Sequence, residues 1–142
     1  MINTIVTGVD ESETAAVAAR KAAELANVHD AELHVISAYG NQEVRTLRAG
    51  GDVVEINEVE KATRVAQSVA DSLRVEFPNV TITSNAALGQ PGEALVSTAA
   101  ELNADLIVVG NKRVQGFSRV LGSIARDVAS EAHCDVYIAY TR

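Results

Sequence analysis

Strand-like and helix-like segments alternate along almost the whole 142-residue chain, and this alternation limits the folds that it can adopt. Runs rich in apolar and β-branched residues predict five strands, at Asn3–Val9, Ala31–Tyr39, Asn79–Leu88, Ala104–Gly110 and Asp135–Tyr140. Helical patterns lie between them, at Glu13–Val28, about Val54–Glu76, Gly89–Asn103 and Ser123–Ala132. Only in Gly40 to Asp52 do the apolar residues follow no regular spacing, and we expect a loop there.

Alternation of this kind predicts an α/β fold in which helices cover both faces of a parallel sheet. A doubly wound sheet begins in its middle, builds outward on one side and then returns to build the other. We therefore predict a Rossmann-like, five-stranded parallel sheet of order 3-2-1-4-5, in one domain spanning residues 1–142. Ligands of such sheets bind between strands 1 and 4, beyond their carboxyl ends.

Charge and composition exclude several classes of protein. The net charge of −7 argues against general nucleic-acid binding, which needs a dominant cationic face. No apolar run approaches the roughly 20 residues that span a bilayer, and the first residues make a poor signal peptide. The single cysteine, Cys134, permits a reducing compartment, and the histidines lie at no zinc-ligand spacing with it. We expect a cytoplasmic protein that contacts neither membrane nor nucleic acid.

The loop after the fourth predicted strand has the composition of a phosphate site. It runs from Gly110 to Gly122-Ser123, where a helix begins, and it carries three cations, Lys112, Arg113 and Arg119. Glycines let backbone N–H groups approach phosphate oxygens, and a helix start adds unpaired N–H groups and the positive end of a dipole. Neither standard glycine-rich phosphate fingerprint is present.

The turn after the first strand faces this loop across the predicted crevice. Asp10 in that turn is suited to accept a hydrogen bond from a ribose hydroxyl or to hold Mg²⁺ with the nucleotide. Asp10 and Ser12 are also both candidates for the N-cap of the next helix, and Asp10 with Glu13 has capping-box spacing. The capping and binding roles are compatible.

Three long stretches resemble the universal stress protein family: "IVTGVDESETAAVAARKAAELA", "LGQPGEALVSTAAELNADLIVVGNK" and "LGSIARDVASEAHCDVYIAY". Nucleotide-binding members of that family carry the motif G-x2-G-x9-G-[ST]. Gly110 matches its first glycine and Gly122-Ser123 its terminal pair, whereas Arg113 occupies the second glycine position and only eight residues separate it from Gly122. Glu11 replaces the glycine that follows the aspartate in the family's first loop.

The resemblance implies roles for residues on both sides of the crevice. Val9 and Asp10 would lie near adenine and ribose, and Ala38 would line the adenine pocket. Val109 and Gly110 would approach the ribose and the α-phosphate.

The outer phosphates would be held by Gly122, Ser123 and Ile124. Arg113 departs from the motif, and its side chain would either contact phosphate or block the pocket. Ser123 is no convincing nucleophile, because the chain has no G-x-S-x-G elbow and no histidine placed to serve it. The sequence therefore predicts a binding site without catalytic residues.

The function predicted from this resemblance is an ATP-binding regulatory module of the stress response. We expect ATP, with or without Mg²⁺, ahead of ADP or cyclic AMP. The alternatives are a slow ATPase or other nucleotide-hydrolysing enzyme that uses the same pocket, a cyclic AMP binder, and a nucleotide-free dimeric scaffold. We also expect a homodimer through Asp135–Tyr140, because an apolar sheet edge invites pairing, and the resemblance implies antiparallel pairing across a two-fold axis.

Overall fold

The fold is a parallel sheet between two layers of helices, seen in a computed structural model that describes residues 1–40, 51–111 and 121–141, with the backbone alone at 51–57. The strands are β1 (Thr4–Gly8), β2 (Glu32–Tyr39), β3 (Ile82–Leu88), β4 (Leu106–Asn111) and β5 (Asp135–Tyr140). The helices are α1 (Glu13–His29), α3 (Gly51–Glu76), α4 (Pro91–Leu102) and α5 (Ser123–Glu131). All paired strands are parallel, in the order β3-β2-β1-β4-β5, which confirms the predicted fold class and strand order.

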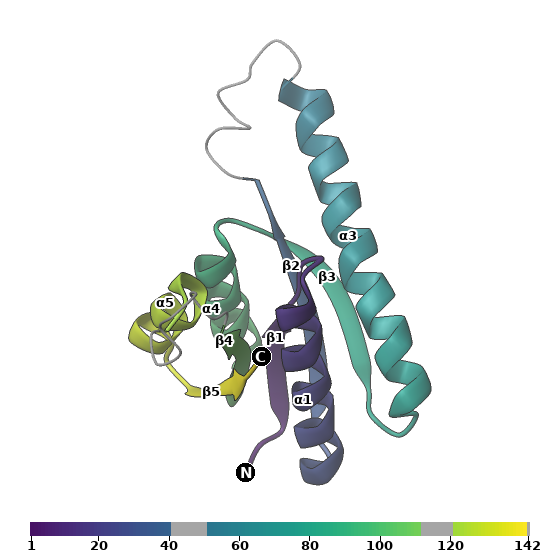
Figure 1. Ribbon diagram of the computed structural model, residues 1–142, viewed down its shortest axis with the longest axis vertical. Helices are drawn as coiled ribbons and strands as arrows, with labels where there is room; N and C mark the ends of the chain where they lie inside the picture. Colours follow the sequence, from purple (N-terminus) through teal and green to yellow (C-terminus); the bar gives the residue numbers. More distant parts are fainter. Residues whose placement is uncertain (41–50, 112–120, 142) are drawn as a thin grey trace.

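Each face of the sheet has its own apolar core. Helices α1 and α3 cover one face and α4 and α5 the other (Figure 1). On the first face α1 contributes only alanines to its buried stripe, namely Ala18, Ala19, Ala22, Ala23 and Ala26. Alanine favours helix, and its small side chain leaves little thickness between helix and sheet, so α1 packs closely over the central strands.

The largest departures from the predicted boundaries are at α3 and β3. Helix α3 begins at Gly51, so Gly51 and Asp52 of the predicted loop belong to the helix, whereas residues 41–50 of that loop lie outside the described residues. Strand β3 begins at Ile82 and not at Asn79, because the chain first turns after Phe77, where the Val80 N–H donates to the Phe77 carbonyl at 3.1 Å. Boundaries are the least secure part of any pattern-based prediction.

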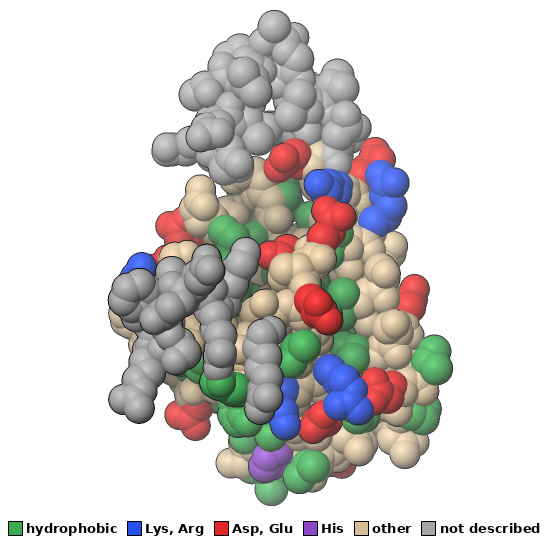
Figure 2. Space-filling view, in the orientation of Figure 1, with side chains coloured by type: hydrophobic (Ala, Val, Ile, Leu, Met, Phe, Trp, Pro, Cys, Tyr) green, Lys and Arg blue, Asp and Glu red, His purple; other side chains and the backbone are tan. Residues whose placement is uncertain are grey.

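Helix α3 is 26 residues long, and its first turns rise beyond the carboxyl ends of the strands (Figure 1). Charged side chains of both signs are interspersed over the outer surface of α1 and α3 (Figure 2). Of the helices that the structure describes, none combines the length and the apolar character needed to cross a membrane.

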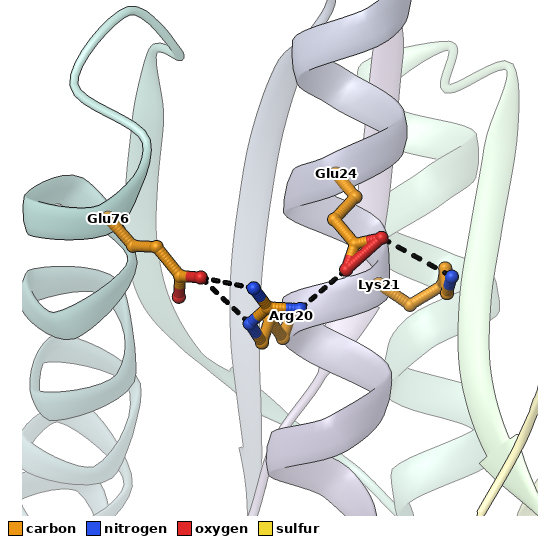
Figure 3. A network of polar contacts seen from close by, with 4 residues as sticks. All are labelled: Arg20, Lys21, Glu24 and Glu76. Carbon is orange, nitrogen blue, oxygen red and sulfur yellow. Dashed lines mark hydrogen bonds and ion pairs between the residues drawn. The ribbon is translucent and has the colours of Figure 1, made fainter.

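Arg20 links α1 to the end of α3 on this outer surface. Its Nε donates to Glu76 Oε2 at 2.9 Å and its Nη1 to Glu24 Oε2 at 2.6 Å, and its Nη2 also contacts Glu76 (Figure 3). The guanidinium carbon lies 5.8 Å from the centre of the Phe77 ring. The hydrogen bond and the charge of Glu76 raise the pKa of Arg20 above its usual value. This exposed network joins the surfaces of the two helices near the end of α3.

Candidate functional site

A cavity of about 490 Å³ opens beyond the carboxyl ends of β1 and β4, a volume typical of small-molecule sites. The chain leaves β1 for α1 on one face, and it leaves β4 for α5 on the other, so the two strand ends diverge. Thr7 fixes the strands just before this point, because its buried Oγ1 donates to the Val108 carbonyl at 2.9 Å. The cavity is therefore at the position where the topology predicts a crevice.

All the predicted site residues that the structure describes line this cavity. They are Val9, Asp10, Ala38, Val109, Gly110, Gly122, Ser123 and Ile124. The remaining one, Arg113, lies outside the described residues, as do Lys112 and Arg119. The positions of these residues are thus known, whereas their roles toward a nucleotide stay predictions.

The β1–α1 turn is held by Asp10 and Ser12 in different ways. Ser12 is the N-cap of α1, and its Oγ accepts from the Ala15 N–H at 3.2 Å. Asp10 Oδ1 accepts from the Ser12 N–H at 2.7 Å, which tightens the turn before the helix. Because Glu13 is the first helical residue, it cannot form the predicted capping box with Asp10. The Asp10 carboxylate is exposed at the cavity mouth.

Two glycines on the central strands let helices approach the sheet beside the cavity. A Cβ on Gly110 would lie 2.9 Å from Thr14 Cγ2 and 3.0 Å from the Thr14 carbonyl oxygen. A Cβ on Gly8 would lie 2.9 Å from Leu95 Cδ1. Gly110 is therefore required by the packing of β4 against α1, whether or not a ligand binds, and the two glycines together shape the cavity from both faces of the sheet.

Three helices begin at the cavity, since every helix of a parallel sheet starts beyond a carboxyl end. The lining includes the first turns of α1, α4 and α5. No side chain of the cap residue satisfies the first N–H groups of α4, which begins with Pro91, or of α5, whose cap is Gly122. Asp10 is the single charged side chain among the described lining residues. Helix N-termini carry partial positive charge, so the cavity is suited to an anionic group.

The sequence did not predict all the residues that line the cavity. The lining residues not predicted are Gly8, Ser12, Thr14, Ala15, Ile36, Pro91, Ala94, Leu95 and Ala125. Most belong to the first turns of α1 and α4 or to the apolar surface beneath them. The topology alone could have predicted that α4 contributes to the cavity. Because α4 follows β3 in a parallel sheet, it begins at the same edge of the sheet as α1 and α5.

Asn111, the last residue of β4, contacts both α5 and the end of the chain. The Gly122 N–H donates to Asn111 Oδ1 at 2.8 Å, and the Thr141 hydroxyl donates to the Asn111 carbonyl at 2.6 Å. The Gly122 backbone has φ −65° and ψ 163°, an extended conformation that any residue adopts. Gly122 therefore does not offer a free N–H to a ligand, and its glycine character has no conformational cause.

The described residues around this cavity offer neither a cluster of metal ligands nor a reactive thiol. Within the residues that the structure describes, no three His, Cys, Asp or Glu side chains gather to hold a metal ion. A role for Asp10 in holding Mg²⁺ with a nucleotide stays a prediction. Cys134 lies outside the cavity lining, and burial, with the nearby charges of Asp135 and Asp105, raises the pKa of its thiol. A raised pKa makes the thiolate scarcer and the cysteine less reactive.

The model of the Universal stress protein family matches residues 1–139 of the chain. The chain belongs to the universal stress protein family. A universal stress protein of Mycobacterium tuberculosis strain H37Rv is 33% identical to it over 144 residues, which cover 97% of this chain and 96% of the relative. The predicted family is thereby confirmed over nearly the whole length.

Solved structures of other universal stress proteins have the same fold. One is a universal stress protein in complex with cAMP, 28% identical, which aligns with a TM-score of 0.73 over 99% of this chain and 98% of its own. Another is the universal stress protein from Archaeoglobus fulgidus in complex with dAMP, 26% identical, with a TM-score of 0.67 over 97% of this chain and 98% of its own. Both of these proteins hold an adenine nucleotide with a single phosphate group.

Proposed function

We propose that this universal stress protein binds an adenine nucleotide in the cavity between β1 and β4 and acts as a nucleotide-binding regulatory module of the stress response. The observation that carries the proposal is the combination of an apolar cavity with three helix starts at its edge, of which those of α4 and α5 have no side-chain cap. Apolar walls suit a purine ring, and helix N-termini suit phosphate. The adenine nucleotides held by two solved relatives support it further.

In the proposed arrangement the ligand lies across the carboxyl edge of the sheet. The adenine packs on the apolar side of the cavity, near Val9 and Ala38. Asp10, exposed at the mouth, accepts from a ribose hydroxyl. The phosphates extend toward Ser123 and Ile124 at the start of α5.

We propose ATP as the preferred ligand, because the segment that joins β4 to α5 adds three cations, Lys112, Arg113 and Arg119. These charges are worth most to a ligand with several phosphates. Arg113 either contacts a phosphate or occupies the pocket, and both readings stay open. Cyclic AMP is the second candidate, favoured by the relative that was solved in complex with it. The described lining has no cation of its own, so a single phosphate served by N–H groups alone is compatible with it.

A calorimetric titration with adenosine, cyclic AMP, ADP and ATP, each with and without Mg²⁺, tests the proposal. We expect adenosine to bind weakly and ATP more tightly than cyclic AMP, because a cyclic phosphate lacks the groups that would reach α5. Tighter binding of cyclic AMP would select the second candidate. Binding of none of the four would overturn nucleotide recognition by this protein.

We also propose that two copies pair through β5. This strand is an edge of the described sheet, with β4 as its neighbour on one side. Tyr137, at 39% exposed, gives it an apolar surface in water. Exposed strand edges template pairing with another strand, and a second β5 running antiparallel would extend the sheet across a two-fold axis.

A further inference from the structure

We infer that Asn111 is a positioning residue for the phosphate end of the cavity, one that fixes the start of α5 against the end of β4. The inference rests on the proposed nucleotide binding and adds to it the residue that aims the helix N-terminus. Asn111 does this through its side-chain oxygen, without contacting the nucleotide itself.

The start of α5 lacks the groups that usually cap a helix. Its cap residue is Gly122, which has no side chain, and the third helical residue is Ala125. In a capping box a Glu or Gln at that third position accepts from the backbone N–H of the cap residue, which an alanine cannot do. Asn111 supplies the acceptor from outside the helix, 2.8 Å from the Gly122 nitrogen. The bond therefore replaces a helix cap with a contact to the neighbouring strand.

Asn111 is itself firmly held. It pairs with Tyr140 in the β4–β5 ladder, and its carbonyl accepts from the hydroxyl of Thr141, a residue that is 3% exposed. The orientation of its side-chain amide is also fixed, because the Gly122 N–H is a donor and only the amide oxygen can accept from it. A rigid acceptor at the end of β4 thus sets where the first turn of α5 begins.

The consequence for the cavity concerns which N–H groups face it. Because the Gly122 N–H is donated to Asn111, the first N–H groups of α5 left for an anion are those of Ser123 and Ile124, both of which line the cavity. A preorganised donor pair binds an anion more tightly than a mobile one, since less freedom is lost on binding. Loss of the Asn111 side chain should therefore weaken the phosphate contacts and spare those of the nucleoside.

The test compares Asn111→Leu, which has a similar size and no acceptor, with Asn111→Asp, which keeps the acceptor and adds a charge. We expect Asn111→Leu to weaken ATP binding about fivefold to tenfold, the effect of one lost hydrogen bond, while adenosine affinity changes less than about twofold. Hydrogen exchange of the Gly122 amide in the nucleotide-free protein should accelerate in Asn111→Leu and stay near wild type in Asn111→Asp. Asn111→Asp should still weaken ATP binding, because its carboxylate repels phosphate.

Asn85→Leu provides the matched control, since Asn85 is an exposed asparagine on β3 outside the cavity lining, and it should change none of these readouts. If wild type binds ATP and Asn111→Leu binds it equally well, or loses ATP and adenosine to the same extent, the inference is overturned and nucleotide binding stands. If wild type binds neither, the proposed function fails and the inference fails with it.

Discussion

Gly110 and Gly122 belong to the same glycine pattern, yet their surroundings differ. A Cβ on Gly110 would meet Thr14, including its backbone oxygen at 3.0 Å, whereas the Gly122 backbone is in an extended conformation open to any residue. The first glycine is thus needed for helix packing. The second position needs no glycine for its backbone conformation, and we propose the ligand as the reason for its small size.

Replacement of Gly110 by alanine should therefore destabilise the fold. We expect a loss of about 1–3 kcal/mol in the free energy of unfolding, the usual cost of overpacking, because the backbone oxygen of Thr14 cannot turn aside as a side chain can. Urea denaturation measures it. Gly8→Ala is the control, since the atoms nearest to its Cβ belong to the side chain of Leu95 and not to a backbone, and it should cost less. Equal losses would contradict this reading of Gly110.

Replacement of Gly122 by valine should separate binding from folding. The change should abolish ATP binding in calorimetry, because a branched Cβ would stand where phosphate approaches the start of α5. The circular dichroism spectrum and the urea midpoint should stay near wild type, since φ −65° and ψ 163° suit valine. Unchanged ATP affinity would mean that the anion does not approach Gly122.

Asp105 should make stability depend on pH in the acid range. Its Oδ2 accepts from the Asn3 and Thr4 N–H groups at 2.8 and 3.0 Å, and these bonds hold its pKa below the usual value. A lowered pKa stabilises the fold above the unfolded-state value of about 3.9, and this contribution is lost as the pH falls through the folded-state value. Asp105→Asn should therefore be less stable than wild type at pH 7, and the difference should shrink by pH 3. A difference independent of pH in urea titrations would refute this.

At the scale of elements, the spacing of apolar residues in the sequence predicts which strand is central and which helix face is buried. The continuous apolar run at Leu106–Val109 predicts a central strand covered on both faces, and β4 is buried throughout this run. The alanines of α1 predict a helix close to the sheet, and they form its buried stripe. These predictions succeed because burial imposes a period of 3.6 on helices and a continuous apolar run on central strands.

What could not be predicted depends on contacts between distant residues. The acceptor for the Gly122 N–H is Asn111, and its own carbonyl is bound by Thr141. No local pattern marks such a bond, because its partners come together only after β4, α5 and β5 have assembled. The choice of Ser12 over Asp10 as the cap of α1 likewise depends on where the turn leaves β1. Local propensity permits both residues.

The proposed pairing through β5 predicts the effect of a charge on that strand. Tyr137 lies near the middle of β5, so antiparallel pairing would bring the two copies of the residue close together across the axis. Tyr137→Lys should shift the mass measured by light scattering from dimer to monomer, because like charges would oppose each other. Val75→Lys is the control, since Val75 is 84% exposed on α3, on the other side of the molecule from β5 (Figure 1). A mass unchanged from wild type in Tyr137→Lys would exclude this interface.

At the scale of the whole molecule, the cavity joins the two layers. Its wall comes from α1 on one face of the sheet and from α4 and α5 on the other. A ligand there contacts the folded arrangement of both layers, and this arrangement does not exist in the unfolded chain. Binding should therefore stabilise the molecule as a unit.

ATP should accordingly raise the free energy of unfolding, and the gain should keep growing with the logarithm of the free ATP concentration above the dissociation constant. At a free concentration one hundred times its dissociation constant the gain should be about 2.7 kcal/mol. Thermal unfolding with increasing ATP measures this as a rising midpoint in wild type and a constant midpoint in Gly122→Val. A midpoint that rises equally in both would show that ATP binds without contacting the start of α5.

The strand order has a consequence for how the chain is made. Strand β1 is synthesised first, and it pairs with β2 through Thr4–Gly8 and with β4 through Ile5–Thr7. Its second partner, Leu106–Val108, leaves the ribosome about a hundred residues later. In the interval the growing chain carries β1 with one open edge and an uncovered apolar face, the combination that templates aggregation. Translation speed and chaperone protection over residues 9–105 should thus decide how much of this protein reaches its native state.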